Sequence, residues 1–187
     1  VNNLTLIMTK YIAFLKAINV GGHTVKMDHL KKIFKKMGLE NVETFIASGN
    51  VVFETKSKSI NSIKKKIETE LEKSLGYKVA TFIRTTKELK EIAEHKPFSE
   101  IDLDNKQNYL YIGFLDNQPD KDSQKKVSEL SDVANEFHFN KTELYWLCRK
   151  NFSDSGISGK VLEKTLGVET TIRNSTTIKK MVLKFCD

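Results

Sequence analysis

The apolar residues predict the same order of secondary-structure elements twice, and this repetition constrains the fold more than any other feature of the chain. In the first copy, apolar residues three or four positions apart indicate two helices, and Gly38 and Gly76 follow them as C-terminal glycines. The predicted elements are strands at 10–15, 42–47, 51–55 and 78–84 and helices at 26–37 and 59–75. This order, β-α-β-β-α-β, is that of the ferredoxin-like unit.

The pattern begins again after a predicted helix at 86–95, where Thr85 and Glu88 have the spacing of a capping box. The second copy has predicted strands at 108–115, 135–139, 143–148 and 168–172, helices at 120–134 and 156–166, and a final amphipathic helix. We therefore expect an α+β fold of two tandem ferredoxin-like (β-α-β-β-α-β) subdomains with antiparallel sheets, plus a C-terminal helix. We place the subdomains at 8–95 and 106–187, joined by the polar stretch 95–106.

Charge bears on whether the chain binds nucleic acid. The net charge is +7, and the basic excess lies mainly in residues 1–86, which carry 15 basic and 7 acidic side chains. A basic surface attracts polyanions. However, 28 of the 31 basic residues are lysines, whereas arginine is the side chain that reads phosphates and bases with two hydrogen bonds. We expect a solvated lysine surface ahead of a nucleic-acid site.

Three sequence features bear on the cellular compartment: membrane spans, a signal peptide and cysteines. No apolar run approaches the roughly 18 residues that span a bilayer. The first residues, "VNNLTLI", lack the basic start and the cleavage site of a signal peptide. The 2 cysteines, Cys148 and Cys186, are too few for a disulfide framework. We expect a cytoplasmic protein with reduced thiols and no membrane partner.

The usual catalytic and metal-binding motifs do not occur. The four histidines have no i, i+4 pairing, neither cysteine has a CxxC partner, and there is no GxSxG. The stretch "GISGK" (156–160) resembles a phosphate-binding loop, but Asp154 and Val161 stand where that motif needs glycine and a hydroxyl residue. We expect no metal and no cofactor, and the sequence leaves open whether the protein is an enzyme.

The stretch "NVGGHTVK" (19–26) is the first candidate site. It joins a predicted strand to a predicted helix, where free backbone N–H groups and the helix dipole favour an anion. Glycines let a backbone approach a ligand closely, and a lysine adds charge. The candidate ligand-binding residues here are Asn19, Gly21, Gly22, His23 and Lys26.

The second candidate is "TTIRNSTTIKK" (170–180), where the last predicted strand enters the last helix. Thr171, Arg173 and Asn174 are its candidate ligand-binding residues. Helix capping explains Asn174, but it does not explain Arg173, one of only three arginines.

The hairpin signal "SGN" (48–50) is explained by a tight turn. Taking the first and third strands of the unit as parallel, we expect this hairpin and the glycine stretch at opposite ends of the sheet, roughly 15–20 Å apart. The two could not then share a small-ligand site. Whether the Arg173 segment meets the glycine stretch depends on how the subdomains pack.

RNA-recognition modules use the same element order and bind bases on aromatic side chains. Tyr109 and Tyr111 on the first strand of the second copy, and Tyr145 on its third, could stack bases. We favour burial of these rings, and nucleic-acid binding is the less favoured alternative.

The stretches "YIAFLKAINVGG", "VKMDHLKKIFKKMGLENVETFIASGNVVFE" and "TTIRNSTTIKK" resemble the uncharacterised bacterial domain-of-unknown-function family 1697. The resemblance extends from about Tyr11 to Lys180. It implies two ferredoxin-like subdomains and implies no activity, substrate or cofactor. In that family the arginine–asparagine pair is usually followed by tryptophan, and here Ser175 follows it.

These observations favour a cytoplasmic, non-catalytic binding protein for a phosphate-bearing or other anionic ligand. A metal-independent enzyme acting on a small phosphorylated substrate, with His23 as the candidate base, is the alternative from another class. The oligomeric state stays open.

Overall fold

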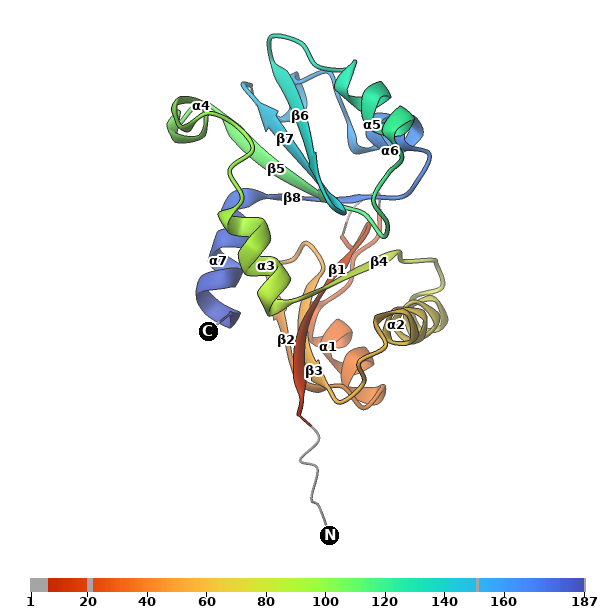
Figure 1. Cartoon of the computed structure of the whole chain (residues 1–187). Helices are drawn as coiled ribbons and strands as arrows, with labels where there is room; N and C mark the ends of the chain where they lie inside the picture. The colour runs from red at the N-terminus through yellow and green to blue at the C-terminus, as the bar shows by residue number, and fades with distance from the viewer. Residues whose placement is uncertain (1–6, 20–21, 151, 187) are drawn as a thin grey trace. The chain divides into compact units, whose positions relative to one another are not determined.

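The computed structural model describes residues 7–19, 22–150 and 152–186. The chain forms two compact units, one ending at Glu88 and the other beginning at Leu89 (Figure 1). We expected the boundary within the polar stretch 95–106, and the observed division lies a few residues before that stretch. No helix in the described ranges is long and apolar enough to cross a membrane.

The first unit has the predicted β-α-β-β-α-β order. Its elements are β1 (Thr9–Leu15), α1 (Met27–Lys36), β2 (Glu40–Phe45), β3 (Asn50–Thr55), α2 (Ile60–Leu75) and β4 (Thr81–Thr85). The strands form one antiparallel sheet in the order β2-β3-β1-β4. The prediction of a ferredoxin-like unit is thus confirmed.

The second unit repeats this arrangement and adds helices. Its elements are α3 (Thr86–Glu94, beginning in the first unit), α4 (Glu100–Asp104), β5 (Tyr109–Phe114), α5 (Lys121–Ser128), β6 (Asn135–Asn140), β7 (Glu143–Cys148), η1 (Phe152–Asp154), α6 (Gly159–Leu166), β8 (Thr171–Asn174) and α7 (Ser175–Phe185). The sheet order is β6-β7-β5-β8, the same as in the first unit. The predicted helix at 120–134 is shorter than expected, since α5 ends at Ser128.

Strand register shows how closely the two sheets correspond. In the first sheet Tyr11 pairs with Phe53 on β3 and with Thr85 on β4. In the second, Tyr111 pairs with Trp146 on β7 and with Asn174 on β8. The central strand therefore has the same partners in the same places in both units.

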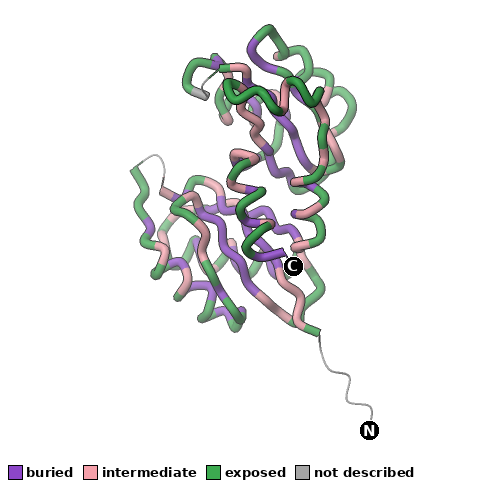
Figure 2. The backbone as a smooth tube through the Cα atoms, turned by 90° about the vertical axis from the view of Figure 1, so that its left-hand side faces the viewer, coloured by how far each residue is buried: buried purple, intermediate pink, exposed green. Residues whose placement is uncertain are grey.

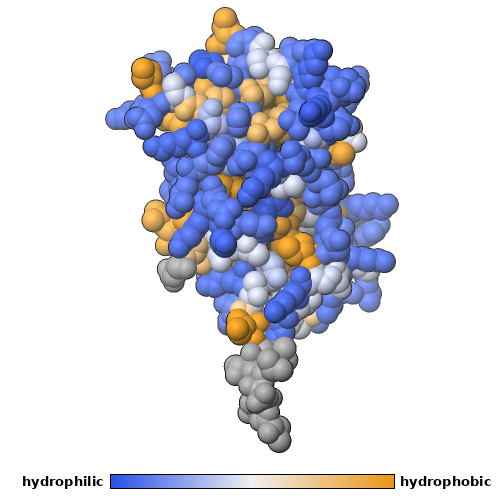
Figure 3. Space-filling model, in the orientation of Figure 1, coloured by the Kyte–Doolittle hydropathy of each residue, from blue (hydrophilic) through white to orange (hydrophobic). Residues whose placement is uncertain are grey.

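Each sheet buries one face under two helices. Because α2 carries Ile63, Ile67 and Leu71 four residues apart, these side chains lie on one face of the helix and pack in the core of the first unit. In the second unit, Trp146 of β7 and Leu162 of α6 belong to the same hydrophobic core. Figure 2 shows the buried residues concentrated along the strands. The face drawn in Figure 3 is mostly hydrophilic, with apolar side chains in separate patches.

The direction of β3 corrects one prediction. β1 and β3 are antiparallel, with Phe14 opposite Asn50. The backbone N–H of Leu15 donates to the carbonyl of Gly49 over 2.8 Å. The expectation that the glycine stretch and the "SGN" hairpin lie at opposite ends of the sheet is therefore wrong. In this unit it is β3 that lies beside β1 in the sheet, so the end of β1 meets the start of β3.

Candidate functional site

Asn19 ties the glycine stretch to the hairpin. Its Nδ2 donates to the carbonyl of Ala47 over 2.9 Å, and its Oδ1 accepts from the backbone N–H of Val25. The backbone of Asn19 is left-handed, with φ of 58°, a conformation that asparagine tolerates better than most residues. Both ends of the amide are thus used inside the protein, so Asn19 shapes the loop.

Gly49 allows the same two segments to pack closely. Its φ is 76°, which disfavours other residues, and a Cβ placed there would lie 2.9 Å from Cβ of Ile18. The glycine of the hairpin is therefore needed for the turn and for contact with the loop that follows β1.

A pocket of about 480 Å³ lies where this loop enters α1. Its polar lining residues are His23, Thr24, Lys26, His29, Ser74 and Tyr77. None of the described residues that line it is acidic. Of the predicted residues, Gly22, His23 and Lys26 line this pocket, whereas Gly21 lies outside the described residues.

The N-terminus of α1 faces this loop without a side-chain cap. Lys26 occupies the N-cap position and makes no capping hydrogen bond, because its ammonium group can only donate. Asp28 is in the first turn but does not line the described pocket. The first backbone N–H groups of α1 are therefore not covered by a capping side chain, and a lysine charge stands beside them.

Tyr77 is a further lining residue of the same pocket. Its hydroxyl oxygen is buried and has no hydrogen-bond partner among the residues that the structure describes. Its ring stacks on that of His23, with 3.8 Å between the ring centroids. Burial raises the pKa of Tyr77, so the hydroxyl keeps its proton near neutral pH. Sequence reasoning missed this residue, because it follows α2 and lies far from the glycine stretch in sequence.

The second predicted segment has structural contacts of its own. Arg173 is buried, and its Nη1 donates to Thr171 Oγ1 over 2.8 Å and to the carbonyl of Ile172 over 2.9 Å. Burial lowers the pKa of Arg173 to about 10. Asn174 caps α7 as predicted, accepting from the N–H of Thr176 over 2.8 Å.

Arg84 gives the physical context for Arg173. It is buried at the matching position of β4, opposite Ile12, just as Arg173 stands opposite Ile112. Its Nη1 likewise donates to the carbonyl of the preceding residue, Ile83, over 2.9 Å. A buried arginine on the fourth strand is thus a feature of both repeats.

The three tyrosines do not form one exposed platform. Tyr145 is fully buried, and its hydroxyl donates to the carbonyl of Ile92 over 3.1 Å. It stands opposite Ile112 in the sheet, so its side chain is on the other face from Tyr109 and Tyr111. Those two rings are half-buried and pack at the edge of the second core.

A cavity of about 520 Å³ in the second unit was not predicted. It is lined by residues of α3, α4, β5, the end of β8 and the first two turns of α7, and by the segments on either side of α4. Its lining includes Asn174 and Ser175, so it adjoins the second predicted segment. The buried Nε2 of His95, another lining residue, has no hydrogen-bond partner within the described ranges.

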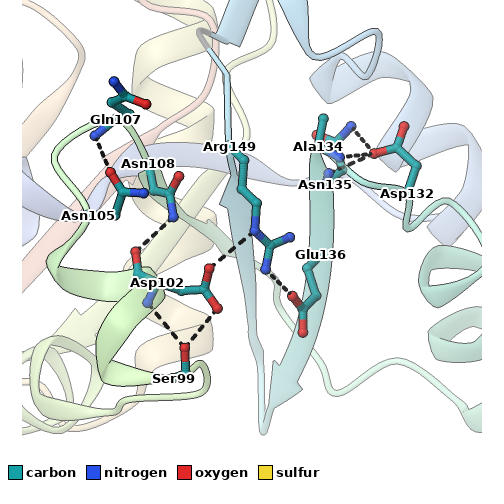
Figure 4. A network of polar contacts seen from close by, with 10 residues as sticks. All are labelled: Ser99, Asp102, Asn105, Gln107, Asn108, Asp132, Ala134, Asn135, Glu136 and Arg149. Carbon is teal, nitrogen blue, oxygen red and sulfur yellow. Dashed lines mark hydrogen bonds and ion pairs between the residues drawn. The ribbon is translucent and has the colours of Figure 1, made fainter.

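A polar network holds the wall that α4 contributes to this cavity (Figure 4). Arg149 donates from Nε to Asp102 over 3.2 Å and from Nη2 to Glu136 over 2.7 Å, which joins α4 to the β6–β7 hairpin. Hydrogen bonds from Arg149 and Ser99 lower the pKa of Asp102. Asn108 Nδ2 donates to the carbonyl of Asp102 over 2.9 Å. Arg149 therefore helps to position α4.

Among the residues that the structure describes, no group of three or more histidine, cysteine, aspartate or glutamate side chains is placed to hold a metal ion. Cys148 and Cys186 are buried and are not joined in a disulfide.

Comparison with known proteins gives a family and a fold. The conserved bacterial protein SP0830 from Streptococcus pneumoniae superimposes with a TM-score of 0.76 and 23% identity, covering 97% of this chain and 100% of that one. Among curated proteins, none matches. The model of the family described as "Protein of unknown function (DUF1697)" matches residues 8–145. Because this match spans well over half of the chain, the chain belongs to that family.

Proposed function

We propose that this protein is a cytoplasmic, non-catalytic binding protein for a small phosphate-bearing or otherwise anionic ligand, held in the glycine-loop pocket of the first unit. The observation that carries the proposal is the gathering of His23, Lys26 and His29 around an uncapped helix N-terminus, with no acidic residue in the described lining.

The chemistry of the pocket supports an anion. Backbone N–H groups at the start of α1 and the helix dipole favour negative charge, and the ammonium group of Lys26 adds to this attraction. The Tyr77 hydroxyl lacks a partner among the described residues, so a bound oxygen would satisfy a donor whose burial otherwise costs free energy. The two buried cysteines, which form no disulfide, are compatible with a reducing compartment.

Calorimetric titration at low salt tests the proposal. The probes are inorganic phosphate, pyrophosphate, a sugar phosphate and a nucleotide. We expect at least one to bind, and we expect Lys26→Ala to weaken that binding by about fivefold, the worth of a partly exposed charge pair. Lys32→Ala is the matched control, because Lys32 is an exposed lysine on α1 that does not line the described pocket. Equal weakening of binding by both variants would mean that only the net charge of the protein matters. If none of the probes binds, the proposal is wrong.

An enzyme acting on a small phosphorylated substrate would use the same pocket. The observation that favours it is His23, an exposed imidazole that lines the pocket beside the Tyr77 ring. If a reaction of a bound ligand is detected, His23→Gln tests whether this histidine takes part in catalysis or only in binding. Lost turnover with retained binding supports catalysis, and unchanged turnover excludes His23 as the base.

A further inference from the structure

We propose that the cavity of the second unit is a separate binding site for a small zwitterionic molecule with an apolar body, the class to which free amino acids belong. This inference does not depend on the anion pocket, because all lining residues of the cavity belong to the second unit. Its volume of about 520 Å³ lies within the range of small-molecule sites.

The charges around the cavity are balanced. Its described lining carries three lysines and three carboxylates: Lys96, Lys106, Lys179, Glu94, Glu100 and Asp104. The glycine-loop pocket, in contrast, has a lysine and no carboxylate in its described lining. A ligand that matches the cavity therefore has no net charge but carries both signs, since a purely anionic ligand would meet the three carboxylates.

The carboxylate of such a ligand fits the α7 side of the cavity. α7 has 11 residues, and Ser175, Thr176 and Lys179 from its first turns line the space. Side-chain hydroxyls, the positive end of the helix dipole and an ammonium group all favour a carboxylate.

A histidine of the lining offers a further polar contact to the ligand. His95 lines the cavity, and its buried Nε2 has no hydrogen-bond partner among the described residues. Buried polar atoms in proteins are nearly always hydrogen-bonded, so this nitrogen is a polar group that a ligand of the cavity could satisfy. Either polar end of the ligand can do so, because neutral imidazole has one N–H and one lone pair.

Residues of α4 and two buried isoleucines fit the rest of the ligand. Asp104 of α4 is an acceptor for an ammonium group, whereas Glu100 is already paired with Lys96 over 3.3 Å. The Arg149–Asp102 contact fixes this helix. Ile92 and Ile112 are buried lining residues and provide an apolar floor for a side chain.

Titration of L-phenylalanine into the isotope-labelled full-length protein, followed by amide chemical shifts, tests the site. We expect saturable shifts at residues 92–112 and 174–179. We expect phenethylamine, which lacks the carboxylate, and 3-phenylpropionate, which lacks the ammonium group, each to bind about tenfold more weakly. No saturable shift in these residues would overturn the proposal. Equal binding of 3-phenylpropionate would overturn it too, because the ligand would then be an apolar anion.

Charge variants locate each end of the ligand. We expect Lys179→Ala to weaken L-phenylalanine binding by about fivefold and Lys180→Ala, a neighbouring exposed lysine on α7 outside the described lining, to leave it unchanged. Asp104→Asn should weaken binding of L-phenylalanine and of phenethylamine but not of 3-phenylpropionate. Weakening of all three probes alike would contradict the assigned orientation. Amide shifts of the first unit on titration with inorganic phosphate test the anion pocket alone. Failure of one site is therefore distinguishable from failure of the other.

Discussion

Tyr77 is the residue at which binding and stability oppose each other. Its buried hydroxyl has no partner in the described structure, and leaving such a group unsatisfied costs about 1–3 kcal/mol. We therefore expect Tyr77→Phe to raise the free energy of unfolding of the ligand-free protein by about 1 kcal/mol. Chemical denaturation with and without an anionic probe measures this, and the same variant should bind the probe more weakly.

Tyr145→Phe is the matched comparison for that measurement. The hydroxyl of Tyr145 donates to the carbonyl of Ile92, so its removal leaves a buried carbonyl without this bond and should lower stability by about 1 kcal/mol. If both phenylalanine variants change stability in the same direction, the Tyr77 hydroxyl is not the unsatisfied donor that we describe.

His95 predicts a pH dependence of stability. Burial, and then the neighbouring His138, lower the pKa of His95 below its ordinary value of 6.5. The unfolded chain therefore takes up this proton at a higher pH than the folded protein does. The contribution of His95 to stability is fully present above pH 6.5 and is lost as the pH falls towards the folded pKa.

We expect His95→Gln to reduce the loss of unfolding free energy between about pH 7.5 and about pH 5.5. Denaturation curves at both pH values measure this, and His29→Gln, at an exposed position, is the control. An unchanged pH dependence in His95→Gln would contradict the assignment.

Among the elements, the β2–β3 hairpin supports the glycine stretch through Gly49. An alanine there combines a positive φ with a Cβ 2.9 Å from Ile18, whereas alanine at Gly38 meets a positive φ and open space. We expect Gly38→Ala to cost about 1 kcal/mol of stability and Gly49→Ala about 1–3 kcal/mol more. Thermal unfolding of the two variants measures the difference. Equal costs would mean that the hairpin and the loop are not in close contact.

The helix α4 depends on Arg149 in a similar way. Arg149→Met removes the charged hydrogen bond to Asp102 of α4 and the bond to Glu136 of β6 that orients the same guanidinium. We expect the amide of Leu103, which donates to the carbonyl of Ser99, to exchange with solvent about tenfold faster in this variant. Lys150→Met is the control. Unchanged exchange at Leu103 would show that other contacts hold α4.

For the whole molecule, the fold could be predicted because its signals are local. The spacing of Ile63 and Ile67, the capping box at Thr85 and the glycines that end helices each report on one element, and the repeated order of elements fixed the architecture. Strand direction was judged wrongly, because we took the first and third strands as parallel. That error separated the glycine stretch from a hairpin that it contacts through Asn19.

The candidate sites were only partly predictable for a physical reason. Lys26 and His23 lie in one stretch of sequence, so their pocket was anticipated, but Tyr77 reaches it from the end of α2. The cavity of the second unit takes residues from five separate elements, and no single stretch carries its pattern. Arg173 stays a prediction as a ligand-binding residue, and its burial is shared by Arg84 at the matching position of the other repeat.

Location of a bound anion is the most direct test of the central claim, that the glycine-loop pocket is an anion site. Pyrophosphate is titrated at low salt into isotope-labelled full-length protein, and amide chemical shifts are followed. We predict saturable shifts at residues 22–29 and at Tyr77. We expect Lys26→Ala to weaken the binding that these shifts report, and Lys32→Ala to leave it unchanged. Shifts confined to other lysine-rich surfaces, or unchanged in Lys26→Ala, would contradict the claim.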